Sequence, residues 1–146
     1  MSFTVALPPR SRISRRQWLL GRAAGFLAQA AATRRPNPDA RVARVATWAV
    51  GGARRPSTAA EAEQAVRAVT TAHPALGGAT ACLDRAVAAL LYCRAHGHAP
   101  ALVVGVRPGT AQVHAWIEAE GVPAAEPADP RLGHTPVIVH RPGVPT

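Results

Sequence analysis

The sequence predicts an α+β fold in which helices come first and a small antiparallel sheet follows. Apolar residues recur with a helical period up to about residue 95, and the period changes to two after Pro100. The length of 146 residues allows one domain with a modest hydrophobic core. Since no apolar run approaches the ~18–20 uncharged residues of a membrane span, we do not expect an integral membrane protein.

Positive charge is concentrated in the first third of the chain. The sequence has no lysine, and residues 1–55 contain 11 arginines against one acid, Asp39. Residues 56–146 contain 6 arginines against 7 acids. We therefore divide the chain into a basic helical N-terminal region, residues 1–56, and a core domain, residues 57–146. The basic region lacks zinc-finger spacing and interleaved aromatic residues, which disfavours nucleic acid as its partner. An arginine-rich segment can still attract nucleic acid, an acidic peptide or an acidic protein.

The first predicted helix covers residues 17–32, which are rich in alanine and leucine. Its start, Ser-Arg-Arg-Gln-Trp-Leu-Leu, superficially resembles a twin-arginine export signal. Arg22 and Gln29 interrupt the apolar stretch, however, and no good cleavage site follows. We interpret the segment as an ordinary helix that ends at a breaker cluster, residues 34–38.

Two further segments precede the central helix. Residues 40–50 are predicted to form a short helix or an extended piece. Thr58 followed three residues later by Glu61 fits a capping box, which predicts that a helix begins there and runs to about Thr71. The apolar face of that helix comprises Ala62, Ala65, Val66 and Val69.

The clearest helix in the sequence runs from about Ala81 to Ala95. Thr80 is a plausible N-cap, and Gly97 lies near the C′ position that often ends a helix. The spacing i, i+4, i+7, i+8 forms an apolar stripe suited to packing on a sheet, made of Leu83, Val87, Leu90 and Leu91.

Strands are predicted over residues 102–106, 113–119 and 136–140, with turns at Pro108–Gly109 and Glu120–Gly121. Alternation within the second strand separates two faces. One face is apolar, with Val113, Ala115, Ile117 and Ala119, and the other carries His114, Trp116 and Glu118.

The two cysteines are predicted to have different roles. Eleven residues of helix separate Cys82 from Cys93, a span of ~16 Å that no disulfide can bridge. Cys93 lies among apolar residues and is most simply a small core residue. Cys82 lies in the first turn, where the helix dipole and free amides favour a reactive thiolate and can stabilise an oxyanion.

A cysteine nucleophile also needs a base, and His114 on the downstream strand is the candidate. A cysteine that begins a helix, with a histidine on a following strand, is typical of papain-like and transglutaminase-like enzymes. A purely structural role for both residues remains the alternative. Glu118 is too far along the strand to orient the imidazole, at ~13 Å between alpha carbons, and is interpreted as a solvated residue. The remaining histidines show no metal-ligand spacing, so we expect no metal.

The segment from Thr80 to Gly121 resembles the lasso-peptide biosynthesis B protein family, in its stand-alone leader-peptidase form. The matching features are Cys-Leu-x-Arg-Ala at the start of the helix, Leu-Val-x-Gly-Val-Arg in a strand, and then His-Ala-Trp-Ile-Glu followed by a glycine turn. The resemblance implies a transglutaminase-like cysteine peptidase with Cys82 as nucleophile, His114 as base and acid, and Trp116 packed beside them.

The family's third catalytic residue is an Asp about a dozen residues after the histidine. Here that position holds Glu126, with Asp129 three residues beyond. Either carboxylate is a candidate. We favour Asp129, because a shorter side chain within a Pro-Ala-Asp-Pro turn is better fixed.

The functional hypothesis is a cytoplasmic cysteine peptidase, without cofactor, that removes the leader from a lasso-peptide precursor. The resemblance implies two partners, a separate leader-binding protein and an ATP-dependent cyclase; the chain itself lacks a phosphate-binding Gly-x-x-x-x-Gly-Lys-Ser/Thr motif. The alternatives are a transglutaminase-like acyltransferase and a non-catalytic, arginine-rich binding module.

Overall fold

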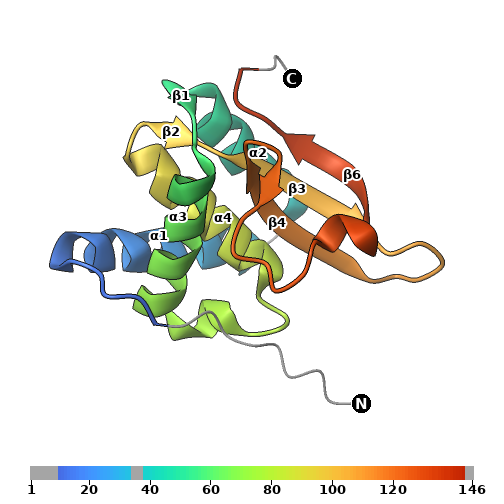
Figure 1. The fold of residues 1–146 in the computed structure, drawn as a ribbon, viewed down its shortest axis with the longest axis horizontal. Coiled ribbons are helices and arrows are strands. Elements are labelled where there is room, and N and C mark those ends of the chain that lie inside the picture. The colour runs from blue at the N-terminus through green and yellow to red at the C-terminus, as the bar shows by residue number, and fades with distance from the viewer. Residues whose placement is uncertain (1–9, 34–37, 144–146) are drawn as a thin grey trace.

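The computed structural model in Figure 1 describes residues 10–33 and 38–143. The helices are α1 (Arg15–Thr33), α2 (Pro38–Gly51), α3 (Ala59–Ala72) and α4 (Cys82–Ala95). The strands are β1 (Arg55–Pro56), β2 (His98–Ala99), β3 (Ala101–Val106), β4 (Val113–Ala119), β5 (Val122–Pro123) and β6 (Thr135–His140). Two short 3-10 helices span Pro74–Gly77 and Pro130–Leu132. The expected α+β class, with helices ahead of an antiparallel sheet, is confirmed.

The main sheet has the strand order β5-β4-β3-β6, and every neighbouring pair is antiparallel. β1 and β2 form a separate parallel pair. Figure 1 shows the helices gathered to one side of β3, β4 and β6. Alternation along β4 sends Ala115 and Ile117 into the core that the helices share, whereas Trp116 lies in a small cluster with Ala101 and Val103.

Helix α4 lies at the centre of the molecule, and small side chains allow its neighbours to approach closely. Its residues from Ala86 to Leu90 are all buried. Alanines from every other helix join the same core, among them Ala28, Ala46 and Ala65. The predicted basic region and the predicted core domain therefore share one hydrophobic core. Since alanine has little side chain to order or to clash, it suits close helix packing.

The local predictions can be compared with the described helices. The capping box of Thr58 and Glu61 is confirmed, with both of its hydrogen bonds formed. Residues 40–50 lie in a helix, not in an extended piece. Gly97 follows α4 with a φ of 87°, a left-handed conformation that glycine adopts at little cost. Residues 34–37 of the predicted breaker lie outside the described part of the chain.

The prediction that Thr80 caps α4 is wrong. The N-cap is Ala81, which has no side-chain acceptor for the amides of the first turn. The helix therefore begins one residue later than a threonine cap requires, directly at Cys82. Among the helices of residues 10–33 and 38–143, none has the combination of length and apolar character that crossing a membrane requires.

Candidate active site

Cys82 is the first residue of α4, and its side chain is partly exposed. At this end of a helix the backbone amides point outward and carry a partial positive charge. Ala81 leaves those amides without a cap from its own side chain. The arrangement can stabilise negative charge on the Cys82 sulfur, and on the oxygen of a carbonyl group that the sulfur attacks.

His114 lies near the beginning of β4, opposite Gly105 of β3. β5 pairs only with the far end of β4, at Glu118 and Ala119, so the outer edge of β4 beside His114 is not covered by β5. The amide of Ala115 hydrogen-bonds to Cys82 across this edge. Because β5 pairs with only two residues of β4, the edge of β4 at Ala115 is free to contact the first residue of α4.

Cys82 and His114 form a coupled acid–base pair. Hydrogen bonding to His114 lowers the pKa of the Cys82 thiol, with a further contribution from the Ala115 amide. Hydrogen bonding to Cys82 and to Glu126 raises the pKa of His114 to about 9. Both shifts favour transfer of the thiol proton to the ring, which gives a thiolate beside an imidazolium; such a sulfur can act as a nucleophile and such a ring can supply a proton.

Glu126 is the carboxylate that contacts His114. Its Oε2 lies 3.0 Å from Nε2 of the ring, and its side chain is only 11% exposed. Because Nε2 is engaged by the carboxylate, Nδ1 is the nitrogen left for the thiol. Ala125, immediately before Glu126, has a φ of 51°, an uncommon conformation for a residue with a Cβ. The segment from β5 to Glu126 thus includes a left-handed residue directly before the carboxylate that contacts His114.

The preference for Asp129 as the residue that orients His114 is not supported by the structure. Asp129 bonds instead to the guanidinium of Arg131, with its Oδ2 2.8 Å from Nη2. It also caps the following 3-10 helix through the Arg131 amide. The turn containing Asp129 is well fixed, as its sequence suggested, but it is fixed on Arg131, whose Nη1 donates to the carbonyl of Gly121.

Trp116 lies beside His114, as the resemblance implied, with the two rings stacked at a centroid distance of 5.8 Å. The interpretation of Glu118 as a solvated residue is wrong, because the residue is only 9% exposed. The Trp116 Nε1 donates to Glu118 Oε1 at 2.8 Å. Glu118 is thus not the acid on His114, but it fixes the indole that packs against that ring.

Arg85 is a supporting residue to which the sequence analysis assigned no role. Its Nη1 donates to the carbonyls of Leu76 and Gly78, at 3.0 and 3.3 Å. These contacts hold the segment that leads into Cys82, and the positive charge contributes to the lowered pKa of the thiol. The available signal was its position one helical turn after Cys82.

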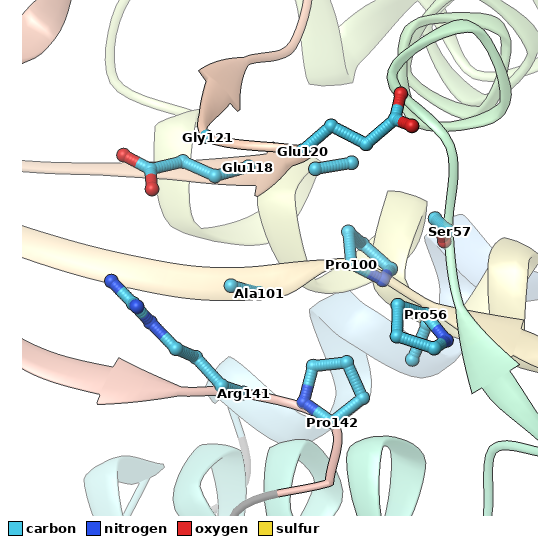
Figure 2. Close-up of a pocket in the computed structure, with 11 residues that line it drawn as sticks. Pro56, Ser57, Pro100, Ala101, Glu118, Glu120, Gly121, Arg141 and Pro142 are labelled. Atoms are coloured by element: carbon cyan, nitrogen blue, oxygen red, sulfur yellow. The ribbon is translucent and has the colours of Figure 1, made fainter.

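A cavity of about 220 Å³ lies at the end of β4 that is farther from His114, and it is drawn in Figure 2. Ser57 lines it, and its Oγ is 2.7 Å from Nδ1 of His98, whose Nε2 is 3.8 Å from a Glu61 oxygen. Burial lowers the pKa of His98. Ser57 is only 2% exposed, so we interpret this cluster as a buried link between α3 and β2. In Figure 2, Glu120 points toward α3, where its carboxylate accepts from the Ala59 amide.

Residues 24–139 match the transglutaminase-like superfamily. No curated protein and no solved structure matches the chain. The matched range includes Cys82, His114 and Glu126.

Proposed function

This chain belongs to the transglutaminase-like superfamily, and from that premise we propose that it is a cysteine peptidase that removes the leader from a lasso-peptide precursor. The observation that carries the proposal is the contact series Cys82–His114–Glu126, in which a thiol with a lowered pKa faces an imidazole held by a carboxylate. Support for the substrate comes from the sequence features between Thr80 and Gly121 that resemble the lasso-peptide B proteins.

In the proposed reaction, the Cys82 thiolate attacks the carbonyl carbon at the junction between leader and core. The resulting oxyanion lies near the amides that begin α4. The C–N bond then breaks as the His114 imidazolium gives its proton to the leaving amine of the core, and the leader remains as a thioester on Cys82. The neutral imidazole next takes a proton from water, which attacks the thioester; the C–S bond breaks, the leader is released as a carboxylic acid, and the Cys82 thiolate is restored beside the His114 imidazolium.

Two partners are part of the proposal. A separate leader-binding protein delivers the precursor, and an ATP-dependent cyclase uses the freed amine to close the ring. Both partners follow from the resemblance, and the excess of positive charge in residues 1–55 suits an acidic partner. Because the cyclase consumes ATP, the proposed place of action is the cytoplasm.

The test is mass spectrometry of a candidate precursor incubated with the leader-binding protein, the cyclase and this chain. We expect the wild-type protein to release free leader and the Cys82→Ala variant to release none. Cys93→Ala is the matched control, because Cys93 is fully buried in the core and its burial raises the pKa of its thiol to about 12. Cleavage that survives in Cys82→Ala contradicts the proposed nucleophile.

Two other outcomes separate the alternatives. The superfamily includes acyltransferases as well as peptidases, so a leader joined to an added amine instead of water indicates acyl transfer. If Cys82→Ala keeps every measurable function and binding falls steeply with salt, the chain is a binding module.

A further inference from the structure

A cavity of about 340 Å³ lies directly beside the candidate nucleophile, between the sheet and helices α2 and α4. Cys82 itself lines it, together with Leu83 from the same helix turn and with Val42 and Ala43 from α2. A group attached to the Cys82 sulfur therefore has direct access to this space. The cavity in Figure 2, by contrast, has no cysteine among its lining residues.

The register of the sheet explains the floor of the cavity. Ala115, Val104 and Ile138 are aligned across β4, β3 and β6. All three line the cavity, so its floor is one cross-strand row of apolar side chains. The row begins at Ala115, whose amide hydrogen-bonds to Cys82, and ends at the edge strand. The apolar surface is thus continuous from the thiol to the edge of the sheet.

Two of the lining side chains are strongly exposed although they are apolar. Val113 is 56% exposed and Ile138 is 50% exposed. Exposed apolar side chains gathered at a concave site beside a nucleophile are typical of a ligand pocket. Apart from Cys82, only two of the lining side chains are polar, Asp39 and His140. The cavity is therefore suited to a side chain without charge.

We propose that this cavity is a specificity pocket that binds a bulky apolar side chain of the substrate residue next to the bond that Cys82 attacks. The inference rests on the proposed peptidase function, because it assumes that Cys82 accepts a peptide acyl group. It adds the class of residue that the chain selects: a large aliphatic or aromatic residue rather than a small or charged one. Binding energy from such a pocket positions the scissile carbonyl against the sulfur.

The first experiment probes the pocket without any peptide cleavage. Alkylation rates of Cys82 are measured by mass spectrometry with iodoacetamide, N-benzyl iodoacetamide, N-(4-carboxybenzyl) iodoacetamide and N-(4-aminobutyl) iodoacetamide. For each reagent, the rate relative to iodoacetamide is divided by the same relative rate measured with free cysteine. After this normalisation we expect the benzyl reagent to react roughly tenfold faster than iodoacetamide, because the cavity removes its ring from water. The carboxybenzyl and aminobutyl reagents are expected to show no such gain.

Two variants of helix α2 test whether the preference depends on the cavity. Ala43→Trp places a large ring at the cavity from an exposed position on α2, and it is expected to abolish the benzyl preference. Thr47→Trp adds the same ring to an exposed position of α2 that does not line the cavity, and it is expected to retain the preference. Because both positions are exposed, both variants are expected to fold, which circular dichroism checks.

The outcomes distinguish the pocket from the proposed function. Equal normalised rates for all four reagents, or a preference that Ala43→Trp leaves intact, overturn the pocket. A faster aminobutyl reagent also overturns it, since Asp39 and not the apolar floor then decides selection. In a precursor assay, residues flanking the cut are changed to Asp, Ala and Leu. Cleavage indifferent to these changes contradicts the pocket alone, whereas a benzyl preference with no precursor cleaved contradicts the peptidase proposal alone.

Discussion

At the scale of single residues, the site depends on how Cys82, His114 and Glu126 share the thiol proton and the N–H proton of the imidazole. Glu126 stabilises a positive charge on His114, and that charge stabilises a negative one on Cys82. His114 is only 23% exposed and Glu126 only 11%, so water screens their interaction weakly. The raised pKa of His114 means that the ring stays protonated up to about pH 9 and then loses the proton that the leaving amine needs.

The exchange Glu126→Gln tests this coupling. The amide keeps the shape of the side chain but removes the charge that raises the pKa of His114. We expect kcat/KM for precursor cleavage to fall roughly tenfold or more. We also expect the alkaline limb of its pH profile to move from about pH 9 in the wild type to a lower pH.

Asp129→Asn is the matched control for that exchange. Asp129 is paired with Arg131, so its loss is expected to leave the alkaline limb near pH 9. An unchanged limb in Glu126→Gln, or a shifted one in Asp129→Asn, contradicts the assignment of the carboxylate on His114.

At the scale of elements, the position of α4 depends on close packing of its neighbours. α1 meets the end of α3 at two glycines four residues apart. A Cβ on Gly21 would lie 2.9 Å from the Cβ of Ala72 and 3.1 Å from the carbonyl oxygen of Ala68. The Arg22 Nη1 donates to the carbonyl of Ala72 next to this contact. Since neither backbone nor methyl group can turn away, the contact requires glycine.

Gly21→Ala is therefore expected to destabilise the fold even though alanine is the better helix former. Overpacking costs about 1–3 kcal/mol, more than the helix propensity gained. Gly51→Ala is the matched control, because a Cβ added there has no atom within 4 Å apart from its chain neighbours and the backbone of its own helix. It is expected to leave the free energy of unfolding unchanged or raise it slightly. Urea unfolding monitored by circular dichroism measures both, and equal effects would contradict the close contact of α1 with α3.

At the scale of the whole molecule, charge and exposed apolar surface are unevenly distributed. Residues 1–55 carry 11 arginines and one acid, whereas the remainder of the chain is almost neutral. Helix α1 also presents exposed Trp18 and Phe26, with the Arg22 guanidinium 5.2 Å from the centroid of each ring. Arginine beside exposed aromatic rings is common in protein interfaces.

This distribution predicts salt-sensitive association with the proposed leader-binding protein. We expect the dissociation constant, measured by calorimetry, to rise several-fold between low and moderate NaCl, because screening weakens long-range attraction. Arg12→Glu and Arg16→Glu, both at exposed positions, are expected to weaken binding. Arg107→Glu, at an exposed position in the near-neutral part of the chain, is expected to have little effect. Binding that is indifferent to salt and to all three changes rules out a role for the N-terminal charge.

The sequence alone determined those features that depend on neighbours along the chain. The helical and strand periods predicted the order of elements, and the Thr58–Glu61 spacing predicted a helix start, since both reflect local backbone geometry. The same local reasoning identified Cys82 as a thiol at a helix start, and the need for a base selected His114. The structure brings these two side chains together, whereas their chemical roles remain predictions.

Only the tertiary structure decided which distant groups meet. Glu126 and not Asp129 contacts His114, whereas Asp129 is bound by the guanidinium of Arg131. Glu118 is buried, and its carboxylate accepts a hydrogen bond from the indole of Trp116 on the same face of the sheet. The cavity beside Cys82 requires three strands and two helices to be assembled. Such contacts depend on the path that each loop takes over the surface. That path is stabilised by interactions with residues far away in the sequence, which local patterns do not contain.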